Sequence, residues 1–165
     1  MLGCHLRLYH RFNQLVTSLR ISEQLMDTTY IVTPFIAWFI AGTAKFGINS
    51  IKAKSAAFKQ IGYGGFPSNH TSIVTSIAWL IAFKEGVDSP ALGVAIALSF
   101  IVILDATSLR MKVGAHAKRL NALTSDEQPL RERVGHTPAE IFGGILTGLF
   151  TALTIDYLTP WLTLH

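Results

Sequence analysis

The sequence predicts an all-α fold, a membrane-embedded bundle of about four transmembrane helices with an amphipathic helix before it. Half of the 165 residues are hydrophobic and only 15% are charged. The mean hydropathy is +0.40, which is high for a soluble domain of this size. Apolar segments also alternate with short polar stretches along the chain. A soluble four-helix core is the alternative, because most of the apolar runs are shorter than the roughly 20 residues of a usual membrane span.

Four apolar segments define the expected bundle. They run from Thr28 to Ala44, from about Pro67 to Phe83, from Pro90 to Leu104, and from Pro138 to about Leu158. In the last segment Gly144 and Gly148 are four residues apart, a spacing that lets another helix approach closely. We therefore expect residues 28–165 to form one transmembrane helical domain.

Residues 1–27 form a separate N-terminal amphipathic segment. Apolar residues recur there at helical spacing between arginines, at Leu8, Phe12, Leu15 and Leu19. Such a helix lies in the membrane interface or packs on the bundle. The scattered charges argue against a cleavable signal peptide, and the single cysteine excludes an internal disulfide.

The net charge of +4 points to membrane lipids as partners and not to nucleic acid. The basic residues lie in the gaps between apolar segments and form no single run with interleaved aromatic residues. If the four helices alternate in direction, the loops 45–66 and 105–136 emerge on one side. These loops hold ten of the 14 Lys and Arg residues, so we expect a multi-pass integral membrane protein with these loops in the cytoplasm.

The stretch "GGFPSNH", residues 64–70, has the composition of an anion-binding turn. Its glycines, Gly65 among them, let backbone amides point toward one position. Pro67 or Ser68 can begin a helix whose free N–H groups attract an anion, and His70 lies just inside that helix. Alternatively, Ser68 is an ordinary N-cap and His70 an interfacial polar residue.

A second candidate stretch contains His136 and Glu140, which share a face if one helix includes both. The carboxylate then holds the imidazole in one tautomer, as a nucleophilic or basic histidine requires. The same stretch also has the pattern of a helix capping box, with Thr137 as N-cap, Pro138 at N1 and Glu140 at N3. His70, His116, His136 and Glu140 also offer ligands for a first-row metal, although that interpretation leaves the glycines without a role.

Taken in order, these stretches resemble a known family. "IAGTAKFGI", "GGFPSNHTS", "DATSLR", "GAHAKRLN" and "GHTPAEIFGG" are similar to the divergent branch of the type 2 phosphatidic acid phosphatases, which are related to vanadium-dependent haloperoxidases. The resemblance covers about residues 36–150. It implies a phosphatase-like domain that hydrolyses the phosphomonoester or pyrophosphate head group of a lipid phosphate, without a metal or other cofactor.

The resemblance also implies roles for individual residues. His136 attacks phosphorus with Glu140 as its carboxylate partner, and His70 protonates the leaving oxygen. The phosphate oxygens are bound by four groups, namely Lys45, Arg110, Ser68 and the Gly65 backbone. Arg110 is assigned by the order of the motifs and not by spacing, so Arg131 or Arg133 is an alternative, and Asp105 either orients Arg110 or pairs with it structurally. A non-catalytic protein that binds anionic lipid head groups is the competing function, and the lipid and the oligomeric state stay open.

Overall fold

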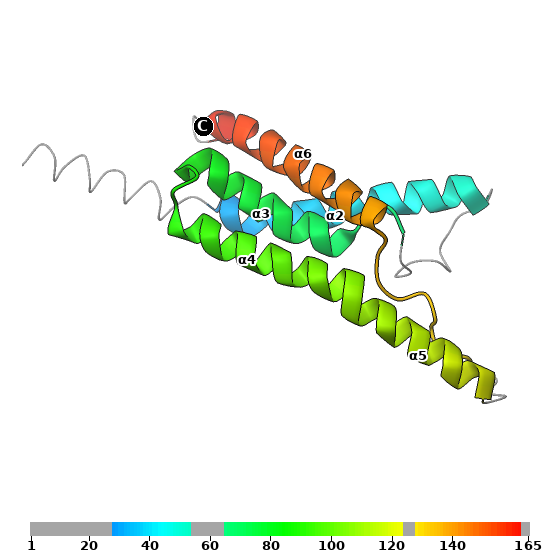
Figure 1. Ribbon diagram of the computed structural model, residues 1–165. Coiled ribbons are helices and arrows are strands. Elements are labelled where there is room, and N and C mark those ends of the chain that lie inside the picture. Colours follow the sequence, from blue (N-terminus) through cyan, green and yellow to red (C-terminus); the bar gives the residue numbers. More distant parts are fainter. Residues whose placement is uncertain (1–27, 54–64, 124–127, 163–165) are drawn as a thin grey trace, which may run out of the picture.

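The computed structural model describes residues 28–53, 65–123 and 128–162, and these residues form helices and their connections (Figure 1). The elements are α2 (Thr29–Ala53), α3 (Asn69–Glu85), α4 (Pro90–Leu104), the π-helical turn η2 (Asp105–Leu109), α5 (Arg110–Leu123) and α6 (Pro138–Leu162). The predicted all-α fold is confirmed. The expected N-terminal amphipathic helix lies outside the described residues.

Helix α3 is the centre of the bundle, and α2, α4 and α6 all pack against it (Figure 1). The contact between α3 and α6 is the most extensive and depends on the two predicted glycines. A Cβ atom on Gly144 would lie 2.7 Å from the Ser68 carbonyl oxygen, and one on Gly148 would lie 2.2 Å from Thr75 Oγ1. The expected close approach of a second helix at this glycine pair is therefore confirmed.

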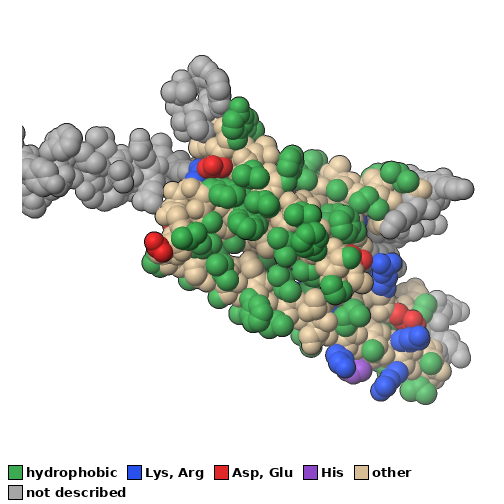
Figure 2. Space-filling model, turned by 45° about the horizontal axis from the view of Figure 1, so that its top comes forward, with side chains coloured by type: hydrophobic (Ala, Val, Ile, Leu, Met, Phe, Trp, Pro, Cys, Tyr) green, Lys and Arg blue, Asp and Glu red, His purple; other side chains and the backbone are tan. Residues whose placement is uncertain are grey.

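The bundle has the polarity of a membrane protein, with hydroxyl side chains inside and large apolar side chains outside. Ser72, Thr71 and Thr151 are fully buried, whereas Phe35 and Phe150 are more than 60% exposed. Figure 2 shows how apolar side chains cover the outer surface of the helices. Small and hydroxyl-bearing residues at helix contacts are typical of membrane bundles.

Three helices in the described part of the chain are long and apolar enough to cross a membrane. They are Thr29–Ile51, the continuous stretch Pro90–Leu123 and Pro138–Thr159. The other expected span, from about Pro67 to Phe83, corresponds to α3, which has only 17 residues and is shorter than these three helices. The expected count of about four transmembrane helices is therefore approximate.

The structure corrects both predicted loops on the polar side. Helix α2 continues to Ala53, so Lys45 lies within a helix, and α4 continues through η2 into α5 instead of ending at Leu104. No proline interrupts the chain between Pro90 and Pro129, and the Arg, Lys, Leu and Met residues of α5 favour helix. The polar residues therefore end the apolar span without ending the helix.

Four pieces of the sequence converge at one end of the bundle. The C-terminal part of α2, the start of α3, the η2 turn and the start of α6 all lie at the end from which α5 extends (Figure 1). Residues 128–137, which we call the return segment, run back from α5 to the start of α6. This end contains every residue predicted to act on phosphate.

Candidate functional site

His136 and Glu140 form a buried pair at the start of α6. The Nδ1 atom of His136 is 3.0 Å from Glu140 Oε2, and both side chains are at most 10% exposed. The same oxygen accepts a hydrogen bond from the backbone N–H of Thr137, while Thr137 Oγ1 accepts one from the N–H of Glu140. The capping box and the histidine–carboxylate pair, both predicted from the sequence, are both present.

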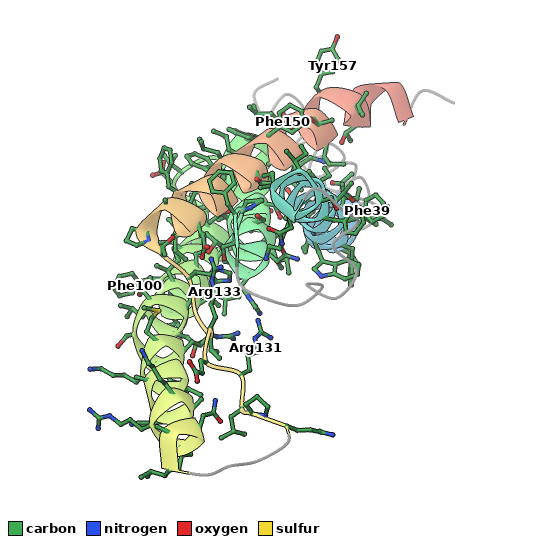
Figure 3. The ribbon with its side chains drawn as sticks, turned by 90° about the vertical axis from the view of Figure 1, so that its right-hand side faces the viewer. Phe39, Phe100, Arg131, Arg133, Phe150 and Tyr157 are labelled. Atoms are coloured by element: carbon green, nitrogen blue, oxygen red, sulfur yellow. The ribbon has the colours of Figure 1, made fainter. Side chains whose placement is uncertain are left out.

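The second oxygen of Glu140 is also occupied. Arg133 donates from Nη2 to Glu140 Oε1 over 3.2 Å, although most of the arginine side chain is exposed. Figure 3 shows Arg131 and Arg133 near the start of α6. Because three hydrogen bonds converge on one carboxylate, its charge and orientation are well defined.

Ser68 begins α3 as its N-cap and is completely buried. Its Oγ accepts hydrogen bonds from the backbone N–H and the hydroxyl of Thr71, at 3.3 and 3.0 Å. The backbone N–H of Ser68 donates to the carbonyl oxygen of Glu140 over 2.9 Å. These bonds fix the starts of α3 and α6 against each other, and the N-cap interpretation of Ser68 is confirmed.

Gly65 lies where α2 meets the chain leading into α3. Its φ of +149° is a conformation that favours glycine, and a Cβ atom there would be 3.8 Å from Asn49 Oδ1 and 4.0 Å from Lys45 Cγ. The structure therefore brings the predicted Gly65 and Lys45 together.

His70 is exposed at the start of α3 and faces His136. The centroids of the two imidazole rings are 6.1 Å apart and their planes are tilted by 57°. Burial lowers the pKa of His136 below its usual value near 6.5, and the charges of Lys45 and Arg110 lower it further, while the hydrogen bond to Glu140 opposes this shift. The direction of this shift favours the neutral form of the His136 imidazole.

Arg110 follows the π turn and pairs with Asp105 at its start. The Nε of Arg110 donates to Asp105 Oδ2 over 2.5 Å, and both side chains are about one-third exposed. This bond uses only Nε, and the Nη groups of Arg110 donate to no other residue in the described ranges. Insertions of π-helix are frequent at functional sites.

Three residues that shape this site had no role in the sequence analysis, namely Gly114, Asn121 and Gly135. Gly135 has φ +95°, and a Cβ atom there would be 2.8 Å from the Ala106 carbonyl oxygen in η2. The next residue, His136, donates its backbone N–H to that same oxygen over 3.0 Å. Gly114 and Asn121 contact the return segment from α5, and both lie in the quoted stretch "GAHAKRLN".

No group of three His, Cys, Asp or Glu side chains within the described ranges is placed to hold a metal ion. His116, a member of the metal alternative, is exposed on α5. A surface groove of about 410 Å³ lies between α5 and the return segment, with Lys118, Arg133 and Glu140 among its lining residues.

Comparison with known proteins identifies the family. The family described as the Divergent PAP2 family matches residues 26–151. The chain belongs to the Divergent PAP2 family. This result confirms the resemblance found in the sequence.

A similar protein from Bacillus subtilis supports the assignment of this Divergent PAP2 protein to the membrane. YuiD of Bacillus subtilis (strain 168), which is named an uncharacterized membrane protein, is 31% identical over 113 residues, covering 57% of this chain and 72% of YuiD. No solved structure matches the chain. Together with the three long apolar helices, the similarity to YuiD indicates an integral membrane protein.

Proposed function

We propose that this Divergent PAP2 protein is a lipid phosphate phosphatase in which His136 is the nucleophile. The observation that carries the proposal is the bond between His136 Nδ1 and Glu140 Oε2. If Nδ1 carries the ring proton and donates a hydrogen bond to the Glu140 carboxylate, Nε2 has the free lone pair that attacks phosphorus. The lowered pKa of His136 keeps this lone pair available at neutral pH.

His70 is the general acid and base of the proposed reaction. Reacting groups in a productive complex lie about 3–3.5 Å apart, so the 6.1 Å between the two rings suits a phosphoryl group bound between them. In the first step a bond forms between His136 Nε2 and phosphorus, the bond from phosphorus to the lipid oxygen breaks, and His70 protonates that oxygen. In the second step His70 takes a proton from water, the water oxygen attacks phosphorus, and inorganic phosphate leaves His136.

Positive charge and backbone dipoles supply the rest of the chemistry. Phosphoryl transfer depends mainly on positioning and on neutralising three equatorial oxygens. We assign this to Lys45, Arg110, the Gly65 backbone and the start of α3 at Ser68, whose helix dipole favours an anion. Arg110 is favoured over Arg133 because its bond to Asp105 uses only Nε and leaves its Nη groups for phosphate, whereas Arg133 uses Nη2 to bond Glu140.

The depth of the site favours a lipid substrate. At the opposite end of the bundle Lys84 Nζ donates to Thr29 Oγ1 over 2.8 Å, and we take this polar contact as the level of the other membrane surface. Along α3, His70 is about 21 Å from Lys84 at 1.5 Å per residue. A hydrocarbon core is about 30 Å thick, so on this measure His70 lies about 9 Å inside the near boundary of the core, at the depth of the first part of the lipid tails. A phosphate reaches this depth most readily when its tails stay in the bilayer.

Phosphate release from purified protein in detergent tests the proposal. The substrates are phosphatidic acid, phosphatidylglycerol phosphate and a prenyl pyrophosphate, each assayed with excess chelator and with vanadate. We expect release that persists in chelator and is inhibited by vanadate. No release from any of the three lipids would favour the alternative, a non-catalytic protein that binds anionic head groups.

Rapid quench with labelled substrate tests the assignment of the nucleophile. We expect an acid-labile, base-stable phosphoryl adduct in the peptide that contains His136, and no adduct in His136→Ala. General acid–base groups contribute typically about 100- to 10,000-fold, so His70→Ala should retain a trace of turnover. An adduct on His70 would reverse the two roles.

A further inference from the structure

The return segment reaches His136 without regular secondary structure of its own. Residues 128–137 form no helix or strand, and Arg131, Glu132 and Arg133 are exposed. A segment of this kind does not define the position of the residue that follows it. The position of His136 is held by its bonds to Glu140 and to the Ala106 carbonyl oxygen, and the contacts of the segment with the neighbouring helix α5 add to them.

One face of α5 is shaped to hold this segment. Gly114, Ala117 and Asn121 recur at helical spacing, and the first two are buried. The Asn121 side chain bonds the backbone of Leu130 twice, by accepting from its N–H and donating to its carbonyl oxygen, each over 2.8 Å. It also donates to Glu132 Oε1 over 3.0 Å.

The same face admits the backbone of the segment further along. A Cβ atom on Gly114 would lie 2.3 Å from the Glu132 carbonyl oxygen, so only glycine permits this contact. Beyond it, Gly135 packs on the carbonyl oxygen of Ala106 and the His136 N–H bonds that oxygen. Contacts at Leu130, Glu132 and Gly135 thus link Asn121 and α5 to the backbone of His136.

We propose that Asn121 is a positioning residue that holds His136 in its reactive place through the return segment. The expected effect on kcat rests on the proposed function, whereas the expected effect on the position of His136 does not. When the amide is removed, the segment loses the bonds that fix its exposed half, and His136 loses its alignment with Glu140 and His70. Lys45, Arg110 and the start of α3 keep their positions, so substrate binding is retained.

The test compares Asn121→Ala with Arg119→Ala in the full-length protein. Arg119 is an exposed residue of α5 with no hydrogen bond to another described residue, so its removal is the matched control. Three quantities are measured: amide hydrogen exchange of the return segment, modification of His136 by diethyl pyrocarbonate with exposed His70 as the internal reference, and kcat with KM.

In Asn121→Ala we expect faster exchange in the return segment, unchanged exchange in α3 and α6, and His136 modification that rises toward that of His70. A small misplacement of a reacting group costs about 100-fold, so kcat should fall about 10- to 100-fold while KM changes less than about threefold. Arg119→Ala should match the wild type in all three measurements.

A second, independent test exchanges the hydrogen-bonding groups of Asn121 and Glu132. Asn121→Asp loses the donor and places a carboxylate against Glu132, so kcat should fall at least as far as in Asn121→Ala. Asn121→Asp with Glu132→Gln restores a donor–acceptor pair at this contact and should recover part of kcat and of the protection of His136.

Unchanged exchange and a protected His136 in Asn121→Ala would overturn the inference, and so would a failure of the paired substitution to recover either quantity. If the wild type releases no phosphate, the proposed function fails alone. The exchange and modification data then still decide whether Asn121 positions His136.

Discussion

Glu140→Gln separates the chemical role of this residue from its structural role. The glutamine oxygen can still accept hydrogen bonds from His136 Nδ1 and from the Thr137 N–H, which are 3.0 and 3.1 Å from Glu140 Oε2. The amide nitrogen then faces Arg133, which loses its acceptor. The helix cap is kept, whereas the negative charge beside the imidazole is lost.

The size of the effect follows from the burial of the pair. When His136 attacks phosphorus its ring becomes positively charged, and the carboxylate of Glu140 stabilises that charge. Two unit charges about 4 Å apart interact by about 4 kcal/mol at an effective dielectric of about 20. A neutral hydrogen bond, which glutamine keeps, contributes about 1 kcal/mol. The difference of about 3 kcal/mol corresponds to a fall in kcat of about 100-fold.

The assay is kcat for phosphate release with thermal unfolding measured in parallel. Glu140→Gln should unfold close to the wild type, and Glu140→Ala, which also lacks the cap, should unfold earlier. Because the carboxylate raises the pKa of His136, the acidic limb of the pH profile should move to lower pH in Glu140→Gln. Wild-type kcat in this variant, or an acidic limb that moves upward, would refute the assigned role.

Three further outcomes can be checked. In the wild type the acidic limb of kcat/KM should have its midpoint below pH 6.5, since the pKa of His136 is lowered and the neutral ring is the nucleophile, and activity should fall again at higher pH as the general acid His70 loses its proton; an acidic midpoint above pH 6.5 would contradict this. Gly135→Ala should reduce both stability and kcat, because φ is +95° and the added Cβ meets the Ala106 carbonyl oxygen at 2.8 Å; a thermal melt and kcat equal to wild type would refute the close contact. With Cys4 removed, a cysteine at Lys118 should resist an impermeant thiol reagent in intact cells while one at Glu85 reacts, and the reverse pattern would invert the predicted sidedness.

The apolar segments and their order could be predicted from the sequence, but the ends of the helices could not. Hydropathy locates the part of a helix that faces lipid, as it did for Pro90 to Leu104. It says nothing about a polar continuation, so α5 was taken for a loop although its residues favour helix. Lys45 was placed in a loop for the same reason.

The site was predictable where its residues are near neighbours in sequence. The pairing of His136 with Glu140 and the cap formed by Thr137 follow from spacings of four and three residues. Glu140 can fill both predicted roles because a carboxylate has two oxygens with several lone pairs. Asn121 and Gly114 could not be assigned, since their contacts depend on how the return segment lies along α5.

The π turn also sets a constraint on the length of the chain. In an α-helix each residue turns by about 100°, and η2 holds α4 and α5 in one continuous helix with a wider turn between them. Deleting a single residue from Asp105–Leu109 could leave an unbroken α-helix, but its outer half would be rotated by about a quarter turn. Gly114 and Asn121 would then face away from the return segment. Natural variants of this protein should therefore tolerate substitutions in η2 far better than insertions or deletions.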